Sequence, residues 1–189
     1  MSALTQIANL LIDTLGTLFV YLLLLRFHMQ WLRAPFRNPI GEFVTGLTNW
    51  LVLPARRIMP GLFGLDMATL IAAWIVEMLV MAALMALRGV QSASGAALAL
   101  IAVLAVIELL RMSLYLLIGA AIVQALVSFM APYSPVAPLL NALTAPFYRP
   151  FRRFIPPVGN IDLTPLFLVL VAEIALIVLG AAAREITAL

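Results

Sequence analysis

The sequence predicts an all-α membrane protein made of two tandem repeats with parallel topology. It has four transmembrane helices and two short interfacial amphipathic helices on the cytoplasmic side. Three observations lead to this class. Hydrophobic residues make up 65% of the 189 residues and charged residues 10%, against about 25% charged residues in an ordinary soluble domain. Four long apolar stretches follow one another along the chain. Its two halves carry the same pattern of prolines, arginines and acids.

The composition excludes several other classes of protein. A soluble globule cannot hide this much apolar surface from water, and intrinsic disorder requires low hydrophobicity and high charge. The chain has no Cys, so we expect no disulfide, no thiolate metal site and no thiol catalyst. The sequence has no phosphate-binding loop, metal-ligand cluster or nucleophile–His–acid set. It therefore predicts a protein that is not an enzyme and uses no cofactor.

Four stretches are long enough to cross a membrane, which takes about 20 apolar residues. They run over residues 4–32, 67–87, 96–129 and 163–183. The first and third exceed one bilayer thickness, so we expect them to tilt or to project from the membrane.

The arginines predict the orientation of these spans. All 11 basic residues are Arg, and seven of them lie in the two segments that join span one to span two and span three to span four. The positive-inside rule places both segments in the cytoplasm and both termini outside. Because the net charge is only +3, we expect no nucleic-acid partner. Anionic lipid headgroups are the expected partners of arginines beside spans.

An internal repeat underlies the pattern. Pro39 and Pro135 are 96 positions apart, and the pairs Arg56–Arg57 and Arg152–Arg153 match at the same offset without a gap. We therefore divide the chain into repeats 1–95 and 96–189, related by a pseudo-two-fold axis along the membrane normal. The repeated motif comprises Pro39, Thr48, Pro54, Pro60 and Asp66 in the first copy and Pro135, Thr144, Pro146, Pro150, Pro156, Gly159, Asp162 and Pro165 in the second.

Each cytoplasmic segment predicts a short helix. Asn38-Pro39 and Ser134-Pro135 each place an N-cap residue before a proline at the first helical position. Apolar residues then recur at helical spacing over runs too short to span, which favours helices lying in the interface. Asp66 and Asp162 precede spans two and four, where we expect them to act as N-caps.

These motifs resemble the YggT family of bacterial inner-membrane proteins, which is related to the YlmG proteins of Gram-positive bacteria and plastids. Family members carry one or two copies of a unit with N-P, T-x-P, P-x-R-R and P-x-x-G-x-I-D-x-S-P elements. The second copy is the more faithful, since the first has Trp50 and Thr69 in place of two motif prolines. The matching stretches are Asn38-Pro39, Pro54-Ala55-Arg56-Arg57, Ser134-Pro135, Thr144-Ala145-Pro146, Pro150-Phe151-Arg152-Arg153 and the run from Pro156 to Pro165.

The resemblance covers nearly the whole chain and implies a multi-pass protein of the bacterial inner membrane. In that membrane, the orientation predicted from the arginines makes both termini periplasmic. It also implies links to osmotic-stress tolerance and ion uptake, to cell division and nucleoid organisation, and, through plastid relatives, to maturation of a cytochrome. None of these is a defined reaction.

Five ionisable residues are expected near one depth in the bilayer, as a candidate proton or cation site. Two carboxylates in a low-dielectric space can share one proton. The alternative is structural, because Glu108 and Arg111 can pair at i and i+3, and Arg111 can also bridge to Asp13. The five residues are Asp13, Glu77, Glu108, Arg111 and Glu173.

The cytoplasmic arginines form the second candidate site, for lipid headgroups or a protein partner. The only His, His28, is interpreted as a headgroup neighbour, with a haem ligand as the weaker alternative. The arginines of this site are Arg56, Arg57, Arg149, Arg152 and Arg153.

Two functions follow as hypotheses. The first is a small scaffold, assembly or osmotic-stress factor that recruits lipids or an unknown membrane-protein partner through the interfacial helices and arginine pairs. The alternative is an ion-transport component that uses the midplane carboxylates, as a homo-oligomer.

Overall fold

The computed structural model describes residues 2–59, 61, 64–89, 94–131, 133–153 and 162–188. Pro60, Pro156 and Gly159 of the motif lie outside the described residues. The elements of the described part are six α-helices: α1 (Ala3–Trp31), α2 (Pro39–Ile58), α3 (Met67–Leu87), α4 (Gly95–Met130), α5 (Ala137–Arg152) and α6 (Thr164–Ala188).

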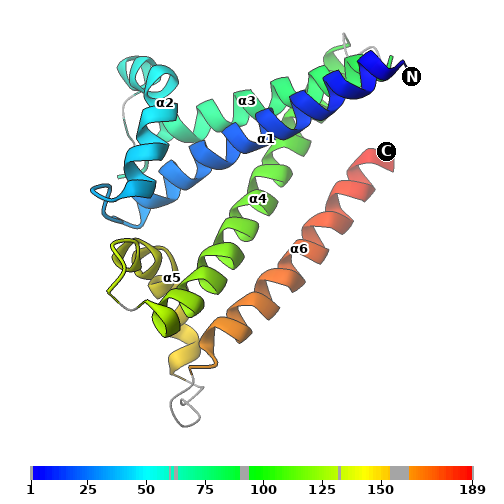
Figure 1. Ribbon diagram of the computed structural model, residues 1–189. Coiled ribbons are helices and arrows are strands. Elements are labelled where there is room, and N and C mark those ends of the chain that lie inside the picture. Colours follow the sequence, from blue (N-terminus) through cyan, green and yellow to red (C-terminus); the bar gives the residue numbers. More distant parts are fainter. Residues whose placement is uncertain are drawn as a thin grey trace.

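Four of these helices, α1, α3, α4 and α6, are long and apolar enough to cross a membrane. This confirms the predicted all-α membrane class with four spans and two additional helices. Figure 1 shows α2 and α5 near one end of the long helices, while both chain termini lie at the opposite end. The two repeats therefore run in the same direction, and the N- and C-termini share one side.

The ends of the shorter helices follow the predicted capping in the first repeat only. The Asn38 side chain accepts a hydrogen bond from the Gly41 N–H at 3.0 Å, and α2 begins at Pro39 as expected. The Ser134 cap is wrong, because α5 begins only at Ala137. The Ser134 hydroxyl accepts from the Val136 N–H at 3.5 Å, and its carbonyl accepts from the Ala137 N–H. Ser134-Pro135 thus forms a turn ahead of the helix, an alternative that a short hydroxyl side chain offers the backbone.

The two predicted caps of the returning spans hold their helices. Asp66 accepts from the Thr69 N–H at 3.4 Å and from the Thr69 hydroxyl at 2.5 Å. Asp162 accepts at 2.9 Å from the N–H of Thr164, the first residue of α6. Each acid thus satisfies a backbone donor that a helix start leaves free.

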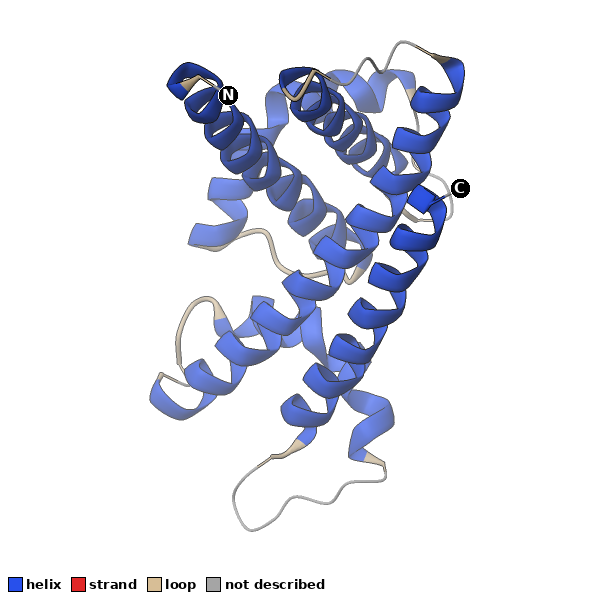
Figure 2. Cartoon of the chain, turned by 90° about the vertical axis from the view of Figure 1, so that its right-hand side faces the viewer, coloured by secondary structure: helices blue, strands red, loops and turns tan. Residues whose placement is uncertain are grey.

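Each repeat pairs its two long helices, α1 with α3 and α4 with α6. The α4–α6 pair lies side by side in both views (Figures 1 and 2). Small residues allow close approach, which drives helix association in lipid. Ala73 of α3 and Ala105 of α4 are fully buried. A Cβ on Gly16 of α1 would lie 2.5 Å from a methyl group of Val80.

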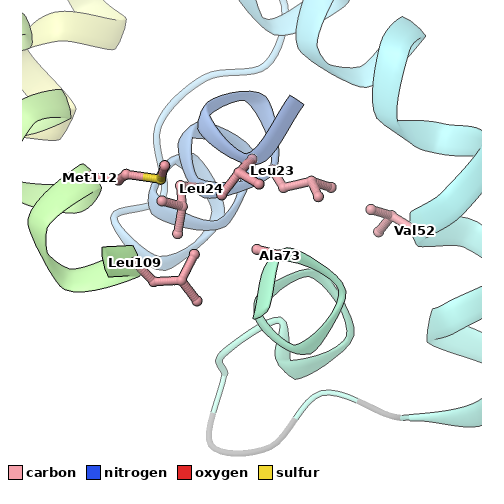
Figure 3. Close-up of a cluster of buried hydrophobic side chains, with 7 residues drawn as sticks. Leu23, Leu24, Val52, Ala73, Leu109 and Met112 are labelled. Atoms are coloured by element: carbon pink, nitrogen blue, oxygen red, sulfur yellow. The ribbon is translucent and has the colours of Figure 1, made fainter. Parts of the chain in front are cut away.

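The repeats meet through α3 and α4, and α1 also contacts α4. Figure 3 shows the core that joins them, where Leu24 of α1 and Ala73 of α3 lie beside Leu109 and Met112 of α4, while Leu23 of α1 points toward Val52 of α2. A two-fold axis between the repeats would pair α6 with α1 in the way that it pairs α3 with α4. Among the described helices, however, α6 contacts only α4 and α5. The predicted pseudo-two-fold relation is therefore wrong. In the part of the chain that the structure describes, the two repeats meet along one side only, and α6 of the second repeat does not contact α1 of the first.

Candidate functional site

Three of the five predicted membrane acids or bases line one cavity of about 590 Å³ between the repeats. Asp13 comes from α1, Glu77 from α3 and Glu108 from α4. Thr14, Thr17 and Tyr21 of α1 add hydroxyl groups to the wall, and its remaining lining is apolar. The cavity thus brings together carboxylates from three of the four candidate spans.

Glu77 is the most enclosed of these acids. It lies at the middle of α3, which packs against both α1 and α4, and its side chain is only 4% exposed. Its Oε2 atom is buried and has no hydrogen-bond partner among the described residues. A buried polar atom without a partner is costly. This oxygen is therefore the natural point for a proton, a water molecule or a small cation in the cavity.

Glu108 is held differently, because Arg111 donates to its Oε2 at 2.7 Å. The predicted i, i+3 ion pair therefore occurs, whereas the suggested bridge from Arg111 to Asp13 does not occur in the described structure. Asp13 is exposed at the rim of the cavity. Among the described residues no three acidic or His side chains are placed to hold a metal ion.

Glu173 does not join this group. Its side chain is exposed on α6, and the cavity wall contains no residue of α6. The expectation that all five ionisable residues meet is therefore wrong. The physical reason is that α4 packs against α3, which carries Glu77, whereas no described helix packs against α6 in the equivalent way.

The motif arginines and motif acids form the same ion pair in both repeats. Arg56 contacts Asp66 at 2.5 Å and also donates to the Gln30 side chain at 2.6 Å. Arg152 contacts Asp162 at 2.9 Å. The Asp66 side chain is 3% exposed and that of Asp162 is 45% exposed. Arg56 and Arg152 thus each join the segment between two spans to the span that follows it.

The ion pairs set the charge of both acids. Burial opposes ionisation of Asp66, but hydrogen bonds from Arg56 and Thr69 outweigh it and hold the pKa of Asp66 below its ordinary value. Burial of Asp162 is likewise outweighed by hydrogen bonds from Thr164 and Arg152, which lower the pKa of Asp162. The equal spacing of ten residues in both copies was the sequence signal for this pairing.

The other arginines of the candidate lipid site remain at the surface. Arg57, Arg149 and Arg153 are exposed near the carboxyl ends of α2 and α5. Arg152 also lies over the Tyr148 ring, 5.5 Å from its centre. Of the five arginines predicted to bind lipid or a partner, Arg57, Arg149 and Arg153 are exposed and form no ion pair among the described residues.

Sequence reasoning missed the role of Arg26. This residue of α1 is 4% exposed and donates to the Thr48 hydroxyl at 2.7 Å and to the Asn49 side chain at 2.9 Å. In the second repeat, Thr144 donates to the Gln124 side chain of α4. The repeated threonines thus join each interfacial helix to the preceding span. The signal available in the sequence was an Arg inside a span together with a Thr that recurs in both repeats.

His28 is half-buried on α1. Its Nδ1 lies 2.6 Å from the Leu24 carbonyl oxygen. The ring lines an apolar groove of about 890 Å³ that Trp31 of α1, Trp74 of α3 and residues of α4 and α6 also line. The headgroup and haem-ligand interpretations of His28 both stay predictions.

Comparisons with known proteins agree with the repeat. The sequence model of the family described as CCB3/YggT matches residues 5–87 and 103–183, one segment in each repeat. An uncharacterized protein of Pseudomonas aeruginosa is 33% identical over 88% of this chain and 85% of its own length. The uncharacterized protein YggT of Escherichia coli K12 is 32% identical over 85% of this chain and 82% of its own length.

A Vibrio alginolyticus protein is also similar, at 31% identity over 91% of this chain and 92% of its own length. No solved structure matches the chain. The printed names of these relatives describe no enzymatic activity. With the family match in both repeats and relatives above 30% identity over most of the chain, this multi-pass membrane protein belongs to the CCB3/YggT family.

Proposed function

We propose that this chain is a proton-binding component of an ion-transport system in the bacterial inner membrane, with its termini in the periplasm. The observation that carries the proposal is the buried Glu77 oxygen, which borders the cavity without a protein partner. Ionisable side chains inside a span are costly and rare, and they mark proton or ion pathways. Glu77 is the group that takes up and releases the proton.

The cavity also offers an entry to Glu77. Gly16 of α1 faces Val80 of α3, and the two helices are antiparallel, so Asp13 lies closer than Glu77 to the end of the molecule that carries the termini. The exposed Asp13 carboxylate and the hydroxyls of Thr14 and Thr17 line the space between. Waters held by these groups supply a hydrogen-bonded path from the periplasmic side.

Replacement of Glu77 by Gln is expected to abolish proton uptake. The purified protein is reconstituted in liposomes with an internal pH dye, and a potassium diffusion potential drives proton entry. Wild type is expected to acidify the lumen well above empty liposomes, and Glu77→Gln to match empty liposomes because an amide carries no exchangeable acid proton. Glu173→Gln is the matched control, since it removes an acid of equal depth outside the cavity, and it should retain flux. Wild-type flux equal to that of empty liposomes sinks the proposal.

A second candidate is the scaffold, assembly or osmotic-stress factor that acts through the interfacial helices. One face of α2 is apolar and exposed, with Phe43 at 60% and Trp50 at 68%. The exposed Arg57, Arg149 and Arg153 lie near the carboxyl ends of α2 and α5, and these two helices lie near the same end of the long helices (Figure 1). An apolar face beside exposed arginines suits an anionic membrane surface or a membrane-bound partner.

The triple variant Arg57→Gln/Arg149→Gln/Arg153→Gln is expected to retain less anionic lipid. Each arginine near the surface contributes about 1 kcal/mol to binding of anionic lipid, so retention of phosphatidylglycerol on purification should fall about tenfold or more. Native mass spectrometry of the bound lipids gives the measurement. Arg88→Gln/Arg184→Gln, which removes exposed arginines at the opposite end, should leave retention unchanged. Equal retention by all three proteins argues against the lipid-recruiting function.

A further inference from the structure

The two repeats differ in one respect that their sequences do not explain. Glu77 and Glu173 occupy the same repeat position, yet Glu77 is 4% exposed and Glu173 is exposed. Both lie mid-helix in apolar spans. The difference arises because α4 covers the outer face of α3, whereas α6 has no described helix at the equivalent place. A carboxyl group that faces lipid at mid-span is expensive.

The repeat itself indicates what covers this face. Within the chain, the second span of one repeat packs against the first span of the next, α3 against α4. Among the described helices, no first span packs against α6 in the way that α4 packs against α3. Likewise, no second span packs against α1 in the way that α3 packs against α4. Gln6 on α1 is exposed, and Leu170 and Ile174 on α6 are 56% and 54% exposed.

We propose that α1 of a second copy of this chain packs against α6 and reproduces the contact between α3 and α4. The contact is heterologous within each pair of helices, but two copies about a two-fold axis make it twice and leave no open end. Four repeats then close into a ring. This self-association stands independently of proton uptake at Glu77.

The sequences of the two faces fit this register. Trp74 of α3 donates its indole N–H to the Ala102 carbonyl of α4 at 3.0 Å. The repeat offset maps this contact onto Leu170 of one copy and Gln6 of the other. It likewise maps the buried Ala105 and Leu109 of α4 onto Asn9 and Asp13 of α1. The α1 face thus carries Gln6, Asn9 and Asp13 in line.

This polar line on α1 offers a hydrogen-bonding partner to the exposed Glu173 of the other copy. Position 173 lies one turn beyond Leu170, on the side away from Asn9 because the two helices are antiparallel, so Glu173 of one copy lies beside the Gln6 amide of the other. A Glu carboxyl and a Gln amide can hydrogen-bond across two helices, which holds spans together in lipid.

Thiol cross-linking in native membranes tests the contact, because the chain has no Cys of its own. The variant Gln6→Cys/Leu170→Cys is treated with a membrane-permeant, short bis-maleimide. The control is Gln6→Cys/Val171→Cys. Val171 is 48% exposed, and its counterpart Ile75 stays 46% exposed even with α4 in place. We expect cross-linked dimer from the first variant at least tenfold faster than from the second.

Native mass spectrometry of the Cys-free protein in mild detergent gives a second measurement that does not depend on either variant. A dimer mass together with selective cross-linking at position 170 supports the contact. Equal cross-linking at 170 and 171 overturns it, because random collisions treat both faces alike. A monomer without cross-linked product also overturns it, and lipid or another protein then covers Glu173.

Discussion

Replacing Gly41 by Ala is expected to destabilise the fold strongly. Gly41 is buried in the first turn of α2, and a Cβ there would lie 2.8 Å from the Phe36 carbonyl carbon and Cα. These are backbone atoms of the turn between α1 and α2. They cannot retreat easily, because the Phe36 carbonyl accepts from the Asn38 N–H at 3.0 Å and Asn38 in turn caps α2.

The expected cost is at the upper end for overpacking, about 3 kcal/mol. For a chain of this size that corresponds to a fall of about 6–12 °C in the melting temperature, measured by circular dichroism in detergent micelles. Gly46→Ala is the matched control in the same helix, because a Cβ at Gly46 meets no atom within 4 Å. Its helix propensity should stabilise the protein by up to about 1 kcal/mol. Equal melting temperatures for the two variants contradict the close approach at Gly41.

Composition and periodicity were sufficient to predict the fold class. Apolar runs end where capping residues and charges begin, so the predicted span 67–87 coincides with α3, Met67–Leu87. The last span was predicted to end at residue 183, yet α6 continues to Ala188. Arg184 and Glu185 interrupt the apolar run but not the helix, because charged side chains are good helix formers. Hydropathy thus locates the part of a helix that lies in lipid and not its end.

The candidate site was only partly predictable, because burial depends on packing between helices. Depth in the bilayer follows from position along a span, and it placed Glu77 and Glu173 at the same level. Which of them faces a neighbour is decided by the angle between the repeats, and the repeated sequence suggested a symmetry that the chain does not have. Arg26 was hidden for a similar reason, since its partner Thr48 lies 22 residues away on another helix.

Asp66→Asn is expected to cost much more stability than Asp162→Asn, although the two acids occupy the same repeat position. Asn retains the capping oxygen, so each substitution removes mainly the charge that faces the arginine. Asp66 is 3% exposed and Asp162 is 45% exposed. A hydrogen bond to a charged group contributes about 1.5–3 kcal/mol, whereas an ion pair open to water contributes about 0–1 kcal/mol. Titration of the folded protein with SDS, followed by circular dichroism, measures the difference.

The same pair predicts a dependence of stability on pH. Because the pKa of Asp66 is lowered in the folded protein, the carboxylate stabilises the fold fully above its unfolded-state pKa of about 3.9. That contribution is lost as the pH falls through the lower, folded-state pKa. The melting temperature of wild type should therefore fall on acidification below about pH 4, and Asp66→Asn should show a smaller fall.

Asp162→Asn provides the control for this acid effect. In wild type the pKa of Asp162 is lowered, like that of Asp66. Arg152 is 53% exposed, so in the variant water replaces the carboxylate beside Arg152 at little cost. This variant should keep most of the acid-induced fall seen in wild type. If Asp162→Asn removes the fall and Asp66→Asn retains it, the ion pair that holds the fold is in the second repeat. The motif arginine of the first repeat would then be free for the lipid surface.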